Sequence, residues 1–191
     1  MKTAAIPLRV DKKGPKNIAK LLFLSAFIVF GMGWQDWQMH TSGLTDEQIS
    51  TFLKTPNNQG GEPTSVEQYK SFESDVRDSH GYLVRGTSLM LSAICLIVGS
   101  ILLHQLKRSG AYLSCLGAGI GLVGGLLGSH IIRQSASEFL GEALALIYEI
   151  WVYLCGASMG LCMAMSALPL FNARARLALT PSVVILHNEE E

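Results

Sequence analysis

The stretch that decides the fold is GAGIGLVGGLLG, residues 117–128, inside an uncharged run at residues 110–132. At about 100° per residue of an α-helix, five of its glycines fall within a sector of roughly 100°, and Gly119 alone lies opposite. The five are Gly117, Gly121, Gly124, Gly125 and Gly128. Each glycine costs a water-soluble helix about 1 kcal/mol relative to alanine, whereas in lipid small residues let two helices approach closely. The stretch therefore predicts a membrane-spanning helix with one face that packs on a neighbouring helix.

Composition supports a membrane protein. The chain has 191 residues and a mean hydropathy of +0.31, and its charges are crowded into a few segments. This pattern is typical of polytopic membrane proteins. The 15 basic and 15 acidic residues cancel, so no overall field favours a nucleic acid partner. The four cysteines all lie in apolar runs, which makes a disulfide framework unexpected.

Three more apolar runs are long enough to cross a bilayer. With the glycine-rich run they predict spans at residues 18–37, 82–104, 110–132 and 143–170. Residues 105–109 then form an inner turn, and residues 133–142 an outer connection. The first run could instead be a cleaved signal peptide, but no A-x-A-like site follows it, so an uncleaved span is favoured. The expected fold is all-α, an antiparallel bundle of four transmembrane helices.

The predicted outer loop, residues 38–80, is the one sizeable polar segment between the spans. Two capping boxes predict two short amphipathic helices there: Thr45 with Gln48, and Ser65 with Gln68. Glu73 and Arg77 are spaced to pair at i, i+4 in the second of these helices. Each apolar stripe is narrow, so the two helices are expected to lie on the membrane or to cap the bundle.

The basic residues predict the orientation. Residues 1–17 form a basic arm, and residues 171–191 form a tail. With both termini in the cytoplasm, that side receives ten lysines and arginines against five on the other side. The positive-inside rule therefore predicts a multi-pass protein of the cell membrane with cytoplasmic termini.

Ionisable residues inside the spans are costly and are the leading site candidates. Arg85 in the second span and Glu149 in the fourth each lie on a small-residue face near the outer end. We therefore expect them to pair with each other or to share a water pocket. The expected partner of the glycine face is the fourth span, through Gly156 and Gly160.

Histidines on the outer side give a second hypothesis. Asp36 and His40 are spaced at i, i+4, and His80 and His130 lie on the same predicted side. Such residues can bind a metal, and two facing histidines can hold haem. Neither arrangement has a diagnostic spacing, so no cofactor is predicted.

Three functions follow from these patterns. The leading one is a non-enzymatic accessory subunit, scaffold or assembly factor, because no catalytic constellation is present. The alternatives are a small transporter or channel component using Arg85 and Glu149, and a metal or haem redox protein using the histidines. Expected partners are the bilayer and a membrane protein or a second copy of the chain. The layout is similar to that of claudins and tetraspanins, but the paired outer-loop cysteines of those families are missing, so their functions are not implied.

Overall fold

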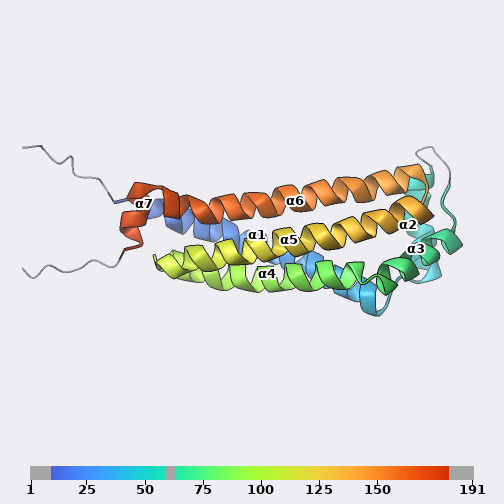
Figure 1. Cartoon of the computed structure of the whole chain (residues 1–191), viewed down its shortest axis with the longest axis horizontal. Coiled ribbons are helices and arrows are strands. Elements are labelled where there is room, and N and C mark those ends of the chain that lie inside the picture. The colour runs from blue at the N-terminus through green and yellow to red at the C-terminus, as the bar shows by residue number, and fades with distance from the viewer. Residues whose placement is uncertain (1–9, 59–62, 181–191) are drawn as a thin grey trace, which may run out of the picture.

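A computed structural model describes residues 10–58 and 63–180, and in this part all regular structure is helical. The four long helices are α1 (Lys13–Thr41), α4 (Gly81–His104), α5 (Arg108–Phe139) and α6 (Glu142–Phe171). The short helices are α2 (Asp46–Asn57), α3 (Val66–Asp78) and α7 (Ala173–Ala178). The long helices pack as an antiparallel bundle, as predicted (Figure 1).

Each long helix can cross a membrane by its length and composition. The shortest has 24 residues, which at 1.5 Å per residue is about 36 Å, more than the roughly 30 Å of a hydrocarbon core. The chain therefore has four candidate spans, and these imply a lipid bilayer as its surroundings. Helix α5 continues seven residues past the predicted boundary at residue 132, because Ile132 and Ala136 are buried beneath the short helices.

The main neighbour of the glycine-rich helix differs from the predicted one. The most extensive contact is between α4 and α5, followed by α1 with α4 and α5 with α6, while α1 and α6 touch little. Figure 1 shows α1 beginning near α6 and α7 and ending near α3 and α4. Helix α4 therefore lies between α1 and α5, and α6 packs mainly on α5.

Helices α2 and α3 cover one end of the bundle, which we call the capped end (Figure 1). Both predicted capping boxes are present: the side chains of Thr45 and Ser65 accept hydrogen bonds from the backbone N–H groups of Gln48 and Gln68. One apolar core joins the two helices to α4, α5 and α6. Its buried members are Ile49, Leu53, Tyr69, Phe72, Val76, Tyr82, Ile132, Ala136, Leu140 and Leu144. The short helices therefore cap the bundle.

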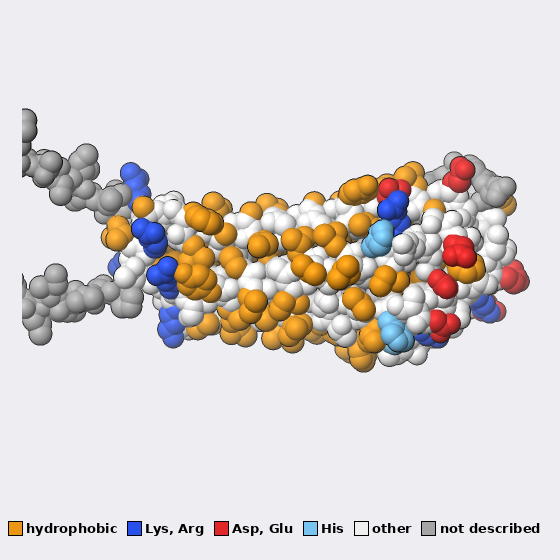
Figure 2. Space-filling model, viewed as in Figure 1, with side chains coloured by type: hydrophobic (Ala, Val, Ile, Leu, Met, Phe, Trp, Pro, Cys, Tyr) orange, Lys and Arg blue, Asp and Glu red, His pale blue; other side chains and the backbone are white. Residues whose placement is uncertain are grey.

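The surface shows three zones (Figure 2). Apolar side chains cover the middle of the bundle, acidic side chains gather at the capped end, and lysines and arginines gather at the opposite end. This opposite end, called the basic end below, is formed by the start of α1, the turn from α4 to α5 and α7. Its described basic residues are Lys12, Lys13, Lys16, Lys20, Lys107, Arg108, Arg174 and Arg176.

Candidate functional site: a buried ion pair beneath the cap

A buried ion pair joins α1 to α4 near the capped end. The Arg85 guanidinium donates from Nε to Asp36 Oδ2 at 2.7 Å and from Nη2 to Asp36 Oδ1 at 2.5 Å. The Asp36 side chain is 5% exposed and that of Arg85 18%. Two parallel charge-assisted hydrogen bonds fix the geometry, and they offset the cost of taking both charges out of water.

Close backbone approaches bring the two residues together. A Cβ added to Gly33 of α1 would lie 2.8 Å from the Gly86 carbonyl oxygen, and one added to Gly86 would lie 3.0 Å from Asp36 Cβ. On the other side of α4, a Cβ on Gly128 would lie 2.7 Å from the Arg85 backbone nitrogen. Glycines on three helices therefore allow α1 and α5 to approach the backbone of α4 closely around Arg85, from two sides.

The expected pair of Arg85 with Glu149 does not form. Glu149 instead lies 3.6 Å from Arg133 of α5, and these side chains are 37% and 43% exposed. The Tyr153 hydroxyl also donates to Glu149, at 3.5 Å. The reason is the packing order: α6 packs on α5, whereas Arg85 points toward α1. An exposed pair of this length contributes little to stability.

The glycine face of α5 packs mainly on α4. The prediction that this face packs on the fourth span, α6, is therefore wrong for most of the face. An added Cβ would meet Cys95 at Gly117, Ser88 at Gly124 and Arg85 at Gly128, all residues of α4. Gly125 faces Cys155 of α6 as well as Leu89 of α4, and a Cβ on Gly121 would meet Met159 as well as Ser92.

The small residues of α6 contribute less than expected. A Cβ on Gly156 would lie 3.1 Å from the Leu126 side chain, which is a close but soft contact. One on Gly160 would have nothing within 4 Å. The main packing seam of the bundle is therefore the one between α4 and α5.

Polar hydroxyls are buried along this seam. The Ser92 hydroxyl lies beside Gly121 and the Ser114 hydroxyl beside Gly99, and neither has a hydrogen-bond partner among the described residues. The buried hydroxyls of Ser129 and Tyr82 have none there either, but no contact places them on this seam. A methyl group added to Gly121 would lie only 2.6 Å from Ser92 Oγ. Because a water molecule needs more room than a methyl group would have there, a continuous column of water past Gly121 does not fit.

The structure brings two of the four metal candidates together. The His40 and His80 rings lie edge to face with centroids 6.2 Å apart, and His40 Nδ1 is buried without a partner in the described chain. Asp36 is engaged by Arg85, and His130 is exposed on α5. Among residues 10–58 and 63–180, no group of three histidine, cysteine or carboxylate side chains is placed to hold a metal ion.

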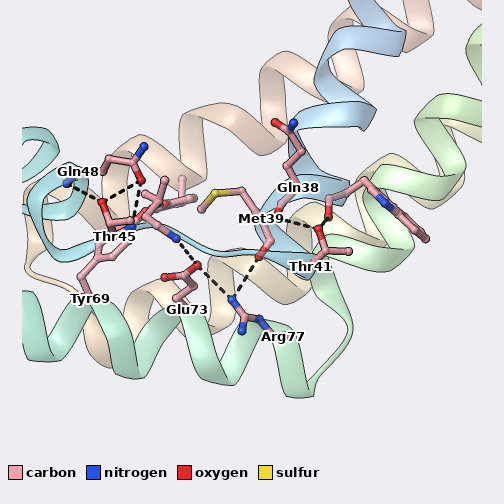
Figure 3. A network of polar contacts seen from close by, with 11 residues as sticks. Gln38, Met39, Thr41, Thr45, Gln48, Tyr69, Glu73 and Arg77 are labelled. Carbon is pink, nitrogen blue, oxygen red and sulfur yellow. Dashed lines mark hydrogen bonds and ion pairs between the residues drawn. The ribbon is translucent and has the colours of Figure 1, made fainter.

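A second polar cluster fixes the cap to α1 (Figure 3). The Glu73 carboxylate, in a residue 6% exposed, accepts from the Leu44 N–H at 3.0 Å and from Arg77 at 3.3 Å, the i, i+4 partner expected from the sequence. Arg77 also donates to the Met39 carbonyl at 3.4 Å. Gly43 has φ +66° and leaves no room for a Cβ beside Glu73, so the turn before α2 requires glycine.

Further hydrogen bonds hold the cap to the other long helices. Ser135 of α5 donates to Asp75 of α3 at 2.6 Å, and the two hydroxyls of Tyr69 and Tyr148 lie 3.4 Å apart. Burial raises the pKa of Tyr69 above its ordinary value, so its hydroxyl stays protonated. The cap is thus bonded to α1, α5 and α6.

The sequence pattern indicates Asp36 only as a candidate metal ligand and does not indicate its pairing with Arg85. A signal was present, because Asp36 continues a stripe of α1 that includes Ala26, Val29 and Gly33 and is buried throughout. Comparison of the chain with models of protein families, with curated proteins and with solved structures finds no match.

Proposed function

We propose that the protein is a non-enzymatic accessory or scaffold subunit of a membrane complex, with both termini in the cytoplasm. The observation that carries this proposal is that hydrogen bonds join the cap to α1, α5 and α6. Beneath the cap, the charges of Asp36 and Arg85 neutralise each other. Bonds to three long helices should hold the cap in one position, so that it presents a fixed polar surface beside the membrane. A rigid, preformed surface suits a lasting contact with a partner, because little ordering is required on binding.

The transport alternative has less support. It would use Arg85 and Glu149, which have separate partners, Asp36 and Arg133. The hydroxyl groups between α4 and α5 favour a polar path, but the close approach of Gly121 to Ser92 leaves no room for one in this conformation. A carrier would have to separate these two helices.

The experiment that tests the proposal places a photo-crosslinking amino acid on the cap in the native membrane. Ser50 on α2 and Ser71 on α3 are exposed, whereas Leu116 on α5 is an exposed apolar residue of the span. A scaffold that acts through its cap gives one protein adduct, the same from Ser50 and Ser71, and a different pattern from Leu116. Adducts only at Leu116, or none at all, would contradict the proposal.

A flux measurement separates the two functions. Purified protein in proteoliposomes is tested for proton, Na⁺ and K⁺ flux against empty vesicles. The scaffold proposal expects no flux above the empty vesicles. Flux that is lost in Arg85→Gln would replace the proposal with transport.

A further inference from the structure

A groove opens on the lipid-facing side of the bundle at the basic end, between α1 and α4. Its volume is about 310 Å³, within the range of roughly 300–1,000 Å³ that is usual for small-molecule pockets. It is lined by Ala19, Lys20, Phe23, Ser100, Ile101, His104 and Gln105. The groove lies outside the ion pair and the cap, and the proposed scaffold function does not use it.

The floor of the groove is apolar. Ala19 and Ser100 are almost completely buried, and the Ser100 hydroxyl is satisfied by donating to the Ile97 carbonyl at 2.8 Å. Phe23 and Ile101 form the sides and remain 39% and 47% exposed. These surfaces offer dispersion contacts and no hydrogen bonds, which suits a hydrocarbon chain.

The rim of the groove is polar and basic. Lys20, His104 and Gln105 lie where α1 enters and α4 leaves the apolar zone, and each offers hydrogen-bond donors. Lys16 is exposed one turn before Lys20 on the same helix. Side chains of this kind extend along apolar surface and keep their charged ends at the level of lipid headgroups.

Nothing acidic in the described chain neutralises this rim. The ion pairs found in residues 10–58 and 63–180 all lie toward the capped end. Asp11 is the one acidic residue described at the basic end. Its carboxylate accepts hydrogen bonds from the backbone N–H groups of Lys13 and Gly14. Within the described residues the rim therefore has no acidic partner beside the apolar groove, and Figure 2 shows lysine and arginine side chains gathered at this end of the bundle.

We infer that this groove binds one anionic phospholipid, with an acyl chain between Phe23 and Ile101 and the headgroup phosphate at Lys20, His104 and Gln105. An apolar groove alone would accept any lipid. The basic rim selects a lipid with net negative charge, because clusters of basic residues at the membrane surface attract anionic headgroups.

The test measures lipid binding to the purified full-length chain in neutral detergent by native mass spectrometry. Dioleoylphosphatidylglycerol is the anionic probe and dioleoylphosphatidylcholine the neutral one. We expect one phosphatidylglycerol to be retained in preference to phosphatidylcholine. Lys20→Gln should weaken phosphatidylglycerol binding about fivefold, the effect of one basic residue near a surface. Lys12→Gln removes a charge from the same end, away from the groove, and should leave binding within about twofold.

A second pair of variants tests the acyl-chain contact. Phe23 and Phe30 are both 39% exposed on α1, but only Phe23 lines the groove. Phe23→Ala should lower retention of phosphatidylglycerol, whereas Phe30→Ala should not, and thermal melting checks that both variants fold. Equal losses for Lys20→Gln and Lys12→Gln, or equal binding of the two lipids, would overturn the inference. Competition by glycerophosphoglycerol, which lacks acyl chains, at the concentration of the lipid would also overturn it.

Discussion

At the residue scale, Asp36 supplies the counter-charge of Arg85 inside the bundle. Asp36→Asn keeps the shape of the side chain but leaves the guanidinium without its counter-charge. Removing one partner of a buried ion pair costs about 3–5 kcal/mol. We therefore expect a large fall in the melting temperature of the purified protein, measured by scanning fluorimetry in detergent.

Two further variants separate this effect from general damage. Asp46 pairs with Lys70 on the surface of the cap, where the side chains are 72% and 49% exposed, so Asp46→Asn should cost less than about 1 kcal/mol. The double variant Asp36→Leu with Arg85→Met replaces both charges with apolar groups and should recover most of the stability. Equal melting temperatures for Asp36→Asn and Asp46→Asn would show that the ion pair is not important.

At the element scale, the seam between α4 and α5 depends on glycine at particular positions. A Cβ on Gly128 would lie 2.6 Å from Arg85 Cβ and 2.7 Å from the Arg85 backbone nitrogen, and the backbone cannot move away cheaply. Gly128→Ala should therefore destabilise the protein by about 1–3 kcal/mol, the usual cost of overpacking. Gly119 faces open space, so Gly119→Ala should leave the melting temperature unchanged or slightly raised. Similar effects of the two substitutions would contradict this account of the seam.

The helices themselves could be predicted, but not their neighbours. The capping boxes at Thr45 and Ser65 are local signals, because each is formed within four consecutive residues. The spacing of the glycines likewise indicates which side of α5 packs closely. It does not indicate which helix lies on that side, since a helical period gives directions only about its own axis. The glycine face was therefore recognised correctly but assigned mainly to the wrong helix.

The attachment of α3 to the end of α1 should respond to loss of the Glu73 carboxylate. Glu73→Ala leaves the Leu44 N–H and Arg77 without their shared acceptor, and a buried group left unpaired costs about 1–3 kcal/mol. We expect faster amide hydrogen exchange in α2 and α3, with exchange in α4 and α5 unchanged. Ser74→Ala, at the next and exposed position, is the control and should not alter exchange. Uniformly faster exchange in all helices would instead indicate global destabilisation.

At the scale of the whole molecule, the number of spans was readable from the sequence because each apolar run exceeds the thickness of a bilayer. The site was not, because it depends on contacts between residues far apart in the chain. Asp36 and Arg85 are separated by 49 positions, and Ser135 and Asp75 by 60. Their meeting follows from the position of α4 between α1 and α5, which no local pattern determines.

The separation of charge along the molecule leads to a prediction about its orientation. The basic end should face the cytoplasm and the cap should face away from it, because basic residues next to spans are retained on the cytoplasmic side. Ser109 at the start of α5 and Ser50 on α2 are both exposed serines, one at each end. In intact cells a membrane-impermeant maleimide should label Ser50→Cys, and it should label Ser109→Cys only after permeabilisation. The unmodified chain, whose four cysteines lie within the long helices, measures the background. Labelling of Ser109→Cys but not of Ser50→Cys in intact cells would reverse the orientation, and the lipid groove would then face the outer leaflet.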